Sequence, residues 1–220
     1  SSFIYIANSH DGFNQSHVFQ HRNSVLENIQ INENKEFVFS DKLNDVFISN
    51  GVFPSAASSA SVLSIALNGD AFIRSVCGVS NIIVNVIDPK SFKPWINGVV
   101  GQPSKYGSDA ICGNDRMYNF QFNILDLEKR KNLVNFLDFI PDGYYVIIRN
   151  TSATSHASNT YSSDWKKDTS VLGSGNSIYH RLCDQGFTTI DLFNSPKAFI
   201  FIYKKNDSVS YRPEFKFSEG

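Results

Sequence analysis

The sequence predicts an α/β domain of the α+β type, in which a β-rich core carries helices. Aromatic residues make up 14% of the 220-residue chain, with 19 Phe and 9 Tyr, while charged residues make up only 19%. This profile is typical of β-rich domains. Residues 81–88 (NIIVNVID) are rich in Ile and Val, as in a buried strand. Residues 117–150 change from a strand period to a helix period and back, so helices accompany the strands.

Residues 117–150 give the clearest order of elements. Phe120 and Phe122 alternate with polar residues, as in a half-buried strand. The apolar residues that follow fall at helical spacing and predict an amphipathic helix, with the neighbouring charged residues on its outer face. The inner residues are Leu133, Val134, Phe136, Leu137 and Ile140, and the outer ones are Glu128, Lys129, Arg130 and Lys131. Pro141-Asp142-Gly143 ends the helix and supplies a turn, after which residues 144–149 form a strand.

The chain before this segment is predicted to consist of strands and connections. Residues 1–45 read as a β-rich extension that either completes this domain's sheet or ends a preceding domain, and a second unit begins near residue 46. Residues 58–67 fit either a strand or a helix. Further elements are expected as strands at 71–76 and 81–88 and as a long ordered loop or decorated hairpin at 89–116.

Beyond residue 150 the sequence predicts a polar loop, a short helix and two strands. Residues 165–171 are expected at the surface. The helix around Ile178 and Leu182 is capped by Ser177 or Asn176 and closed by Gly186. The strands are expected at 188–192 and 198–203. The chain then divides into residues 1–45, a domain at 46–205 and a polar tail or linker at 206–220.

Charge and hydropathy exclude several classes of partner. The formal net charge of −1 and a pI near 6.5 give no electrostatic reason to expect nucleic acid or an anionic membrane surface. No apolar run approaches the roughly 18 to 20 residues of a membrane span, so we expect no membrane insertion. The chain starts in a strand-like segment and ends in an open one, which predicts that it belongs to a longer polypeptide whose other domains are partners.

The residues with catalytic or metal-binding potential are predicted to be structural. Cys77, Cys112 and Cys183 have no zinc-like spacing; we favour free thiols, with a Cys77–Cys112 disulfide as the alternative. His17 and His21 stand four residues apart without a confident helix, and a Cys183 nucleophile near His180 is less common than a buried cysteine. The expectation is therefore no catalytic residue, no metal and no cofactor.

Four aromatic residues are predicted to lie in loops, where exposed rings stack on sugars. They are Trp95, Tyr106, Tyr161 and Trp165. The alternative is that each ring anchors its loop by packing on the sheet. The sequence leaves both open.

The order of several short segments resembles the interleukin-like EMT inducer (ILEI/FAM3-type) domain. The matching segments are 47–51, 78–87, 119–122, 136–146, 182–187 and 199–205, which together span roughly residues 45–205. The resemblance implies a β-sandwich-like core of antiparallel or mixed sheet flanked by two or three helices. Relatives include secreted cytokine-like proteins and a non-catalytic domain that binds sugars, so a glycan or a protein partner is implied.

The resemblance also suggests ligand-binding positions. The family's acidic residues near the end of two strands correspond to Gln121 and Asn150, and its sugar-binding arginine corresponds to Pro196. Adding the neighbouring Arg149 and the loop residue Trp165, the predicted ligand-binding residues are Gln121, Arg149, Asn150 and Trp165.

A second resemblance covers residues 119–122 and 178–203. The sequence of these segments is similar to a central segment of large bacterial surface proteins associated with type IX secretion and gingipain-like (C25) peptidases. It implies an extracellular or bacterial cell-surface location. The leading hypothesis is a non-catalytic structural or interaction module of such a protein. The alternatives are a carbohydrate-binding module and an accessory domain of a cysteine peptidase whose catalytic residues lie outside this chain.

Overall fold

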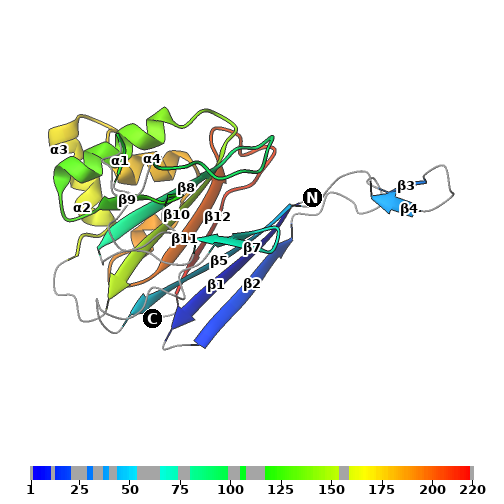
Figure 1. Ribbon diagram of the computed structural model, residues 1–220. Helices are drawn as coiled ribbons and strands as arrows, with labels where there is room; N and C mark the ends of the chain where they lie inside the picture. Colours follow the sequence, from blue (N-terminus) through cyan, green and yellow to red (C-terminus); the bar gives the residue numbers. More distant parts are fainter. Residues whose placement is uncertain are drawn as a thin grey trace.

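The computed structural model describes residues 2–10, 13–20, 29–31, 37–39, 44–53, 65–73, 80–98, 105–107, 117–153 and 159–218. The predicted fold class is confirmed, because a mixed sheet carries helices along one face (Figure 1). The strands are β1 (Ser2–His10), β2 (Phe13–Gln20), β3 (Ile29–Ile31), β4 (Phe37–Phe39), β5 (Asn44–Phe53), β6 (Ile65–Leu67), β7 (Asp70–Ile73), β8 (Asn81–Ile87), β9 (Phe120–Asn123), β10 (Tyr145–Ala153), β11 (Phe199–Lys204) and β12 (Glu214–Phe217). The helices are α1 (Leu127–Phe139), α2 (Ser162–Lys167), α3 (Thr169–Leu172), α4 (Ile178–Asp184) and the 3₁₀ turn η3 (Ile190–Leu192).

Strand β10 is the centre of the large sheet. Its first part pairs antiparallel with β8 on one side and β11 on the other, and its end pairs parallel with β5. The sheet continues from β5 to β1 and β2, from β11 to β12, and from β8 to β9, while a β6–β7 hairpin lies against β5. Strands β3 and β4 form a small separate sheet. Parallel and antiparallel pairs therefore share one mixed sheet.

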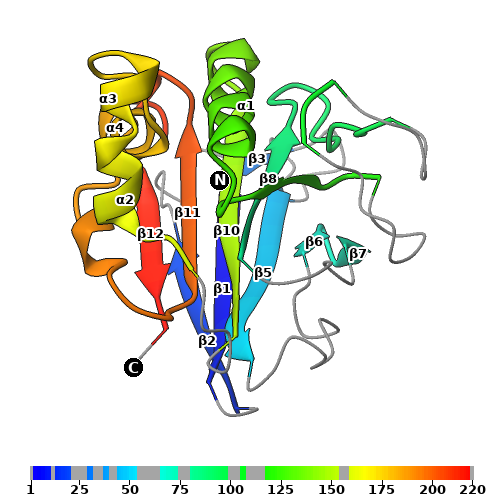
Figure 2. The same cartoon turned by 90° about the vertical axis from the view of Figure 1, so that its left-hand side faces the viewer.

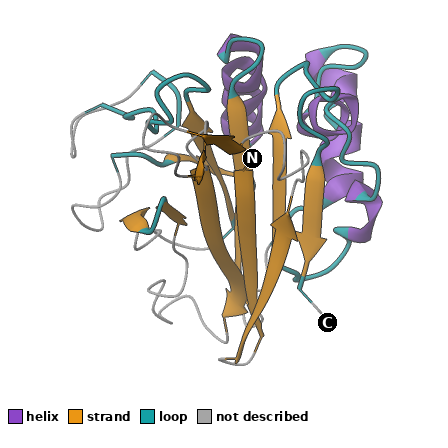
Figure 3. Ribbon diagram, turned by 90° about the vertical axis from the view of Figure 1, so that its right-hand side faces the viewer, coloured by secondary structure: helices purple, strands orange, loops and turns teal. Residues whose placement is uncertain are grey.

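Alternation along β10 divides the core into two clusters. Val146 and Ile148 face the helices and join the larger cluster, whereas Ile147 faces the opposite side and joins a smaller one. Figure 2 shows α1 and the α2–α4 group in front of β10, β11 and β12. Figure 3 shows the opposite side, where the strands are in front of the helices. Ile48 of β5 and Ile65 of β6 complete the smaller cluster, so the sheet is buried on both faces, as in a sandwich.

Helix α1 forms where the sequence places it. Asp126 is its N-cap, and its carboxylate accepts hydrogen bonds from the backbone N–H groups of Glu128 and Lys129. At the other end the Lys205 ammonium donates to the carbonyl oxygens of Leu137 (2.7 Å), Asp138 (2.9 Å) and Ile140. A cation at a helix C-terminus satisfies unpaired carbonyls and favours the dipole.

Several sequence expectations differ from the structure. Residues 188–192 are not a strand but a turn that includes η3. Trp165 is not a surface loop residue, because it lies in α2 and is fully buried. The polar tail at 206–220 contains β12, which pairs with β11. The boundary predicted between residues 45 and 46 falls within β5, and β5 pairs along its length with β1 of the N-terminal extension.

Candidate functional site

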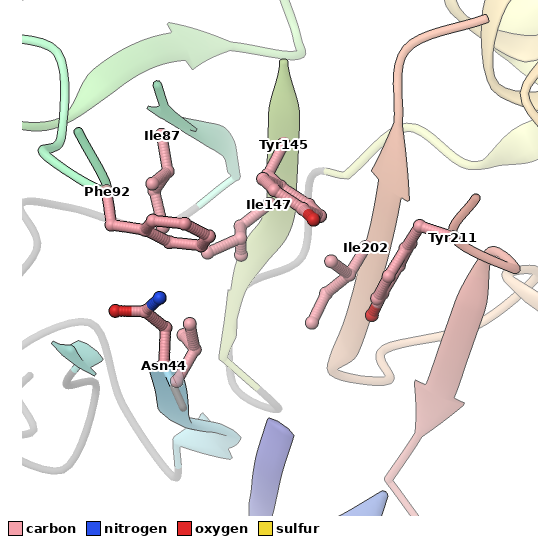
Figure 4. Close-up of a pocket in the computed structure, with 8 residues that line it drawn as sticks. Asn44, Ile87, Phe92, Tyr145, Ile147, Ile202 and Tyr211 are labelled. Carbon is pink, nitrogen blue, oxygen red and sulfur yellow. The ribbon is translucent and has the colours of Figure 1, made fainter. Parts of the chain in front are cut away.

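An apolar pocket opens on the side of the sheet away from the helices, and we call it the aromatic pocket (Figure 4). It encloses about 390 Å³ of space, including open solvent at its mouth. The lining residues are Asn44, Val46, Ile87, Phe92, Tyr145, Ile147, Ile202 and Tyr211. They come from four strands, a turn and a loop, so the pocket exists only in the folded chain.

The floor of the pocket follows from the strand register. Tyr145 of β10 lies opposite Ile87 of β8, and Ile147 lies opposite Ile202 of β11. Directly opposed residues on one face of a sheet place their side chains next to each other. Three neighbouring strands therefore present one continuous apolar surface at this end of the sheet.

Phe92 forms one wall from an unusual backbone conformation. Its φ is 53°, a left-handed value that is an outlier for a bulky residue. The Asp88 carboxylate holds the turn by accepting from the backbone N–H groups of Lys90 and Ser91, both at 2.8 Å, and from the Tyr144 hydroxyl at 3.0 Å. The hydrogen bonds from Ser91 and Lys90 lower the pKa of Asp88. Local hydrogen bonds thus offset strain at a residue whose ring points into the pocket.

Tyr211 forms the opposite wall. Its ring meets that of Tyr145 edge-on, with centroids 5.5 Å apart and an interplanar angle of 87°, the arrangement that aromatic pairs prefer. Its hydroxyl donates to Oε1 of Glu214 at 3.3 Å. Burial raises the pKa of Glu214 and of Tyr211. The wall is therefore aromatic on its pocket side and polar behind.

Asp207 holds the loop that leads into Tyr211. The pKa of the Asp207 carboxyl gives a testable prediction. The Lys204 ammonium lies 2.7 Å from the Asp207 carboxylate, and Ser210 donates to the same carboxylate through its hydroxyl and its backbone N–H. These contacts, that of Lys204 first, lower the pKa of Asp207 to about 2. Because the folded-state pKa lies below the ordinary 3.8, this group stabilises the fold above that value, and the contribution is lost as pH falls towards 2.

Carbon-detected NMR titration of the Asp207 carboxyl checks this prediction. We expect its midpoint near pH 2 in the unmodified chain and a clear rise towards 3.8 in Lys204→Met. Lys129→Met, an exposed change on α1, is the matched control and should leave the midpoint unchanged. An Asp207 midpoint at 3.8 in the unmodified chain would contradict the arrangement.

A second hollow, which we call the polar hollow, lies where α1, α4 and the end of β11 meet. Its volume is about 770 Å³ including open solvent, and it is lined by Leu137, Asp138, Asp142, Arg181, Asp184, Gln185, Tyr203, Lys205 and Asn206. Arg181 makes a bidentate pair with Asp138, at 2.7 and 3.0 Å. Asn206 bonds with Gln185 through its backbone N–H and its side-chain oxygen, and its amide nitrogen donates to Asp142. The hollow therefore offers ordered, planar polar groups.

The four predicted ligand-binding residues are all buried and do not come together. Gln121 and Arg149 flank Ile83 of β8 on the side of the sheet away from the helices, with 6% and 1% exposure. Asn150 lies on the other face, where its amide accepts from the Phe199 N–H and donates to the Lys197 carbonyl, both at 2.7 Å. Asn150 thus joins β10 to the start of β11. The ligand-binding role of these four residues stays a prediction.

The other loop aromatics act as anchors. The ring centroid of Trp95 lies 6.1 Å from that of Phe139 at the end of α1, and that of Tyr106 lies 5.1 Å from it. Tyr161 packs edge-on against Phe193 at 5.4 Å. These contacts match the packing alternative, with the helices as well as the sheet providing the partner surface.

The environment of Cys183, the candidate nucleophile, is that of a structural cysteine. Cys183 is half-buried, and burial raises the pKa of its thiol, with Asp191 and Asp184 acting in the same direction. A raised pKa keeps the thiol protonated and unreactive. His180 shares a hydrogen bond of 2.8 Å between its Nδ1 and Oγ of Ser177, the N-cap of α4. Cys77 and Cys112 lie outside the described residues, so their pairing stays open.

The described residues contain no group of three or more His, Cys, Asp or Glu side chains that could hold a metal ion. None of the helices described has the length and hydropathy that a membrane span needs. Compared with models of known protein families and with curated proteins, the sequence matches none.

Proposed function

We propose that this chain is a non-catalytic interaction module that docks an apolar group of a partner in the aromatic pocket, within a large extracellular or bacterial cell-surface protein. The observation that carries the proposal is the aromatic pocket itself. Its walls are rings and aliphatic side chains, and its polar groups are the Asn44 amide and two phenols. Such a lining binds apolar groups and supplies no acid, base or nucleophile suited to neutral pH. The resemblance to ILEI-type domains supports the non-catalytic role and the location.

The size of the pocket favours a single anchoring group. Only about 30 Å³ of the pocket admits the centre of a water-sized sphere, far less than the roughly 300–1,000 Å³ of common small-molecule sites. Protein interfaces gain most of their affinity from a few side chains that fill such pockets. A partner protein that inserts one side chain therefore fits the geometry better than a large ligand.

A selection of displayed random peptides on the purified 220-residue chain tests the proposal. We expect enriched peptides whose binding is lost in Asn44→Trp, because a large ring at this lining position fills the pocket. Val209→Trp is the matched control, since Val209 is 97% exposed and does not line the pocket. Peptides that bind both variants equally, or no enrichment, would contradict docking in the aromatic pocket.

Carbohydrate binding is the second candidate, and the polar hollow favours it. Ordered carboxylate and amide groups around Asp142 and Asn206, beside the ring of Tyr203, match the hydrogen-bonding needs of sugar hydroxyls. A glycan array run beside the selection separates the two candidates. Signals that fall in Asn206→Ala and survive in Asn44→Trp would favour the sugar; a silent array from the folded chain would remove it.

A further inference from the structure

The polar hollow is much larger than the aromatic pocket when both are measured in the same way. About 370 Å³ of it admits the centre of a water-sized sphere, compared with about 30 Å³ of the aromatic pocket. This volume reaches the range of about 300–1,000 Å³ that is common for small-molecule sites. Most of the lining residues are polar, and they include three carboxylates and two cations. The hollow therefore has room for a small polar ligand.

Both cations of the polar hollow are engaged by the protein itself. Lys205 directs its ammonium N–H groups, of which there are three, to three carbonyl oxygens at the end of α1. Arg181 donates to both oxygens of Asp138. Its other bonds go to the Gly175 carbonyl and to the side-chain oxygen of Asn176, both at 2.9 Å. An anionic ligand would have to compete with these bonds.

The other two carboxylates keep acceptor capacity. Asp142 accepts from the Asn206 amide through Oδ1 at 2.7 Å, and its Oδ2 has no partner in the described part of the chain. Asp184 is exposed at the end of α4 and forms no hydrogen bond or ion pair with the residues that the structure describes. Gln185 and Asn206 join the segments that carry the two carboxylates, through bonds of 2.7 and 2.9 Å. The hollow therefore offers negative charge to a ligand.

The hydroxyl of Tyr203 points independently to a ligand. Tyr203 lies on the helix-facing side of β11, lines the polar hollow and is only 1% exposed. Its ring stacks on Phe201 with centroids 5.0 Å apart, and its hydroxyl has no hydrogen-bond partner among the described residues. Burial, and after it the Asp138 carboxylate, raise the pKa of Tyr203, so the phenol stays protonated. A buried hydroxyl without a partner is costly, and a polar ligand in the hollow supplies one.

We infer that the polar hollow binds a small ligand that carries a primary ammonium group, either an amino sugar or an aliphatic amine. The ammonium supplies positive charge and N–H donors to Asp142 and Asp184, and the Tyr203 hydroxyl bonds a polar atom of the same ligand. The inference is independent of docking in the aromatic pocket, and it rests on the sugar candidate only in sharing its site. Because the two carboxylates are exposed, their contributions are modest and fall as salt is added.

NMR titration of the full chain with two pairs of ligands tests the inference. Glucosamine and N-acetylglucosamine differ in the charge on nitrogen, and cadaverine and the corresponding diol differ in charge without a sugar ring. In at least one pair the cationic member should bind at least about fivefold more tightly than its neutral twin, the ratio that one or two exposed charge contacts give. The side-chain amide signals of Gln185 and Asn206 should shift, whereas that of Asn44 in the aromatic pocket should not.

Two substitutions separate the charge from the hydroxyl. Asp184→Asn removes a charge at an exposed position and should lower affinity for the cationic ligand at least about threefold, with the neutral twin unchanged. Tyr203→Phe keeps the ring stack, removes the hydroxyl and should weaken binding at least about threefold. Glu128→Gln is the matched control, because it removes one exposed charge at the other end of α1. Thermal-shift measurements check that each variant is folded.

The outcomes separate this inference from the proposed functions. Equal binding of the two sugars, with shifts at Gln185 and Asn206, would overturn the ammonium preference and leave the sugar candidate standing. A cationic ligand whose affinity is unchanged in Asp184→Asn and in Tyr203→Phe would overturn the site. Binding of cadaverine alone would support the inference and remove the sugar candidate. If none of the four ligands binds, the inference falls, while docking in the aromatic pocket is decided by the peptide selection.

Discussion

Replacing Arg130 by Met should lower the free energy of unfolding by about 3–5 kcal/mol, because it leaves the Asp168 carboxylate buried without its charge partner. The Arg130 guanidinium donates from Nε and Nη2 to the two Asp168 oxygens, at 2.7 and 2.8 Å, and from Nη1 to the Ile124 carbonyl at 2.8 Å. The two side chains are only 10% and 7% exposed. The pair ties α1 to the junction of α2 and α3 over 38 positions of sequence. Urea unfolding followed by circular dichroism measures the loss.

The double variant Arg130→Met/Asp168→Leu distinguishes an orphaned charge from lost packing. Because apolar replacement of a buried pair is often neutral, the double variant should recover most of the stability lost in the single one. Lys131→Met is the control, since its pair with Glu128 is more than half exposed on both sides and contributes at most about 1 kcal/mol. A loss below about 1 kcal/mol for Arg130→Met would mean that water reaches Asp168 in solution.

Arg130 shows what sequence periodicity can and cannot predict. The apolar stripe and the Pro141 stop were enough to predict α1, and the structure adds Asp126 as its N-cap. Arg130, however, was assigned to the outer face with Glu128 and Lys129, and it is buried. Charged residues in a row indicate a solvated face unless a partner is known, and the partner here lies in a segment that has no helical period. Burial of a charge is a tertiary property, so local spacing could not reveal it.

The sequence likewise predicts one part of the aromatic pocket and misses the rest. Alternation along β10 predicts that Tyr145 and Ile147 share a face, and pairing with β8 and β11 then supplies the floor. The left-handed backbone of Phe92 has no sequence signal, because that conformation favours Gly and Asn. Tyr211 lies in the segment read as a polar tail. The alternation Glu-Phe-Lys-Phe at 214–217 is a strand signal in that segment. The charged residues around it led to the prediction of a polar tail instead.

Replacing Trp165 by Ala should cost about 3–5 kcal/mol of unfolding free energy, the range for truncating a large buried aromatic residue. Trp165 is fully buried in α2, with its ring centroid 5.2 Å from that of Phe193. Its indole N–H donates to the Thr160 hydroxyl at 2.9 Å, and that hydroxyl donates to the Ile124 carbonyl at 2.7 Å. The substitution thus removes ring packing and one link in a hydrogen-bond chain. Urea unfolding gives the loss, which corresponds to about 2–4 °C in melting temperature per kcal/mol.

Trp165→Phe is the informative companion, because it keeps an aromatic ring and removes the indole N–H. It should cost less than Trp165→Ala, since most of the ring packing survives and one hydrogen bond contributes roughly 0.5–1.5 kcal/mol. The hypothesis that Trp165 stacks on a glycan predicts a different pattern, in which stability is unchanged and array signals fall. A stable Trp165→Ala chain with lost glycan binding would contradict the burial of this ring. A destabilised chain whose remaining folded fraction still binds its ligands would assign Trp165 to the core alone.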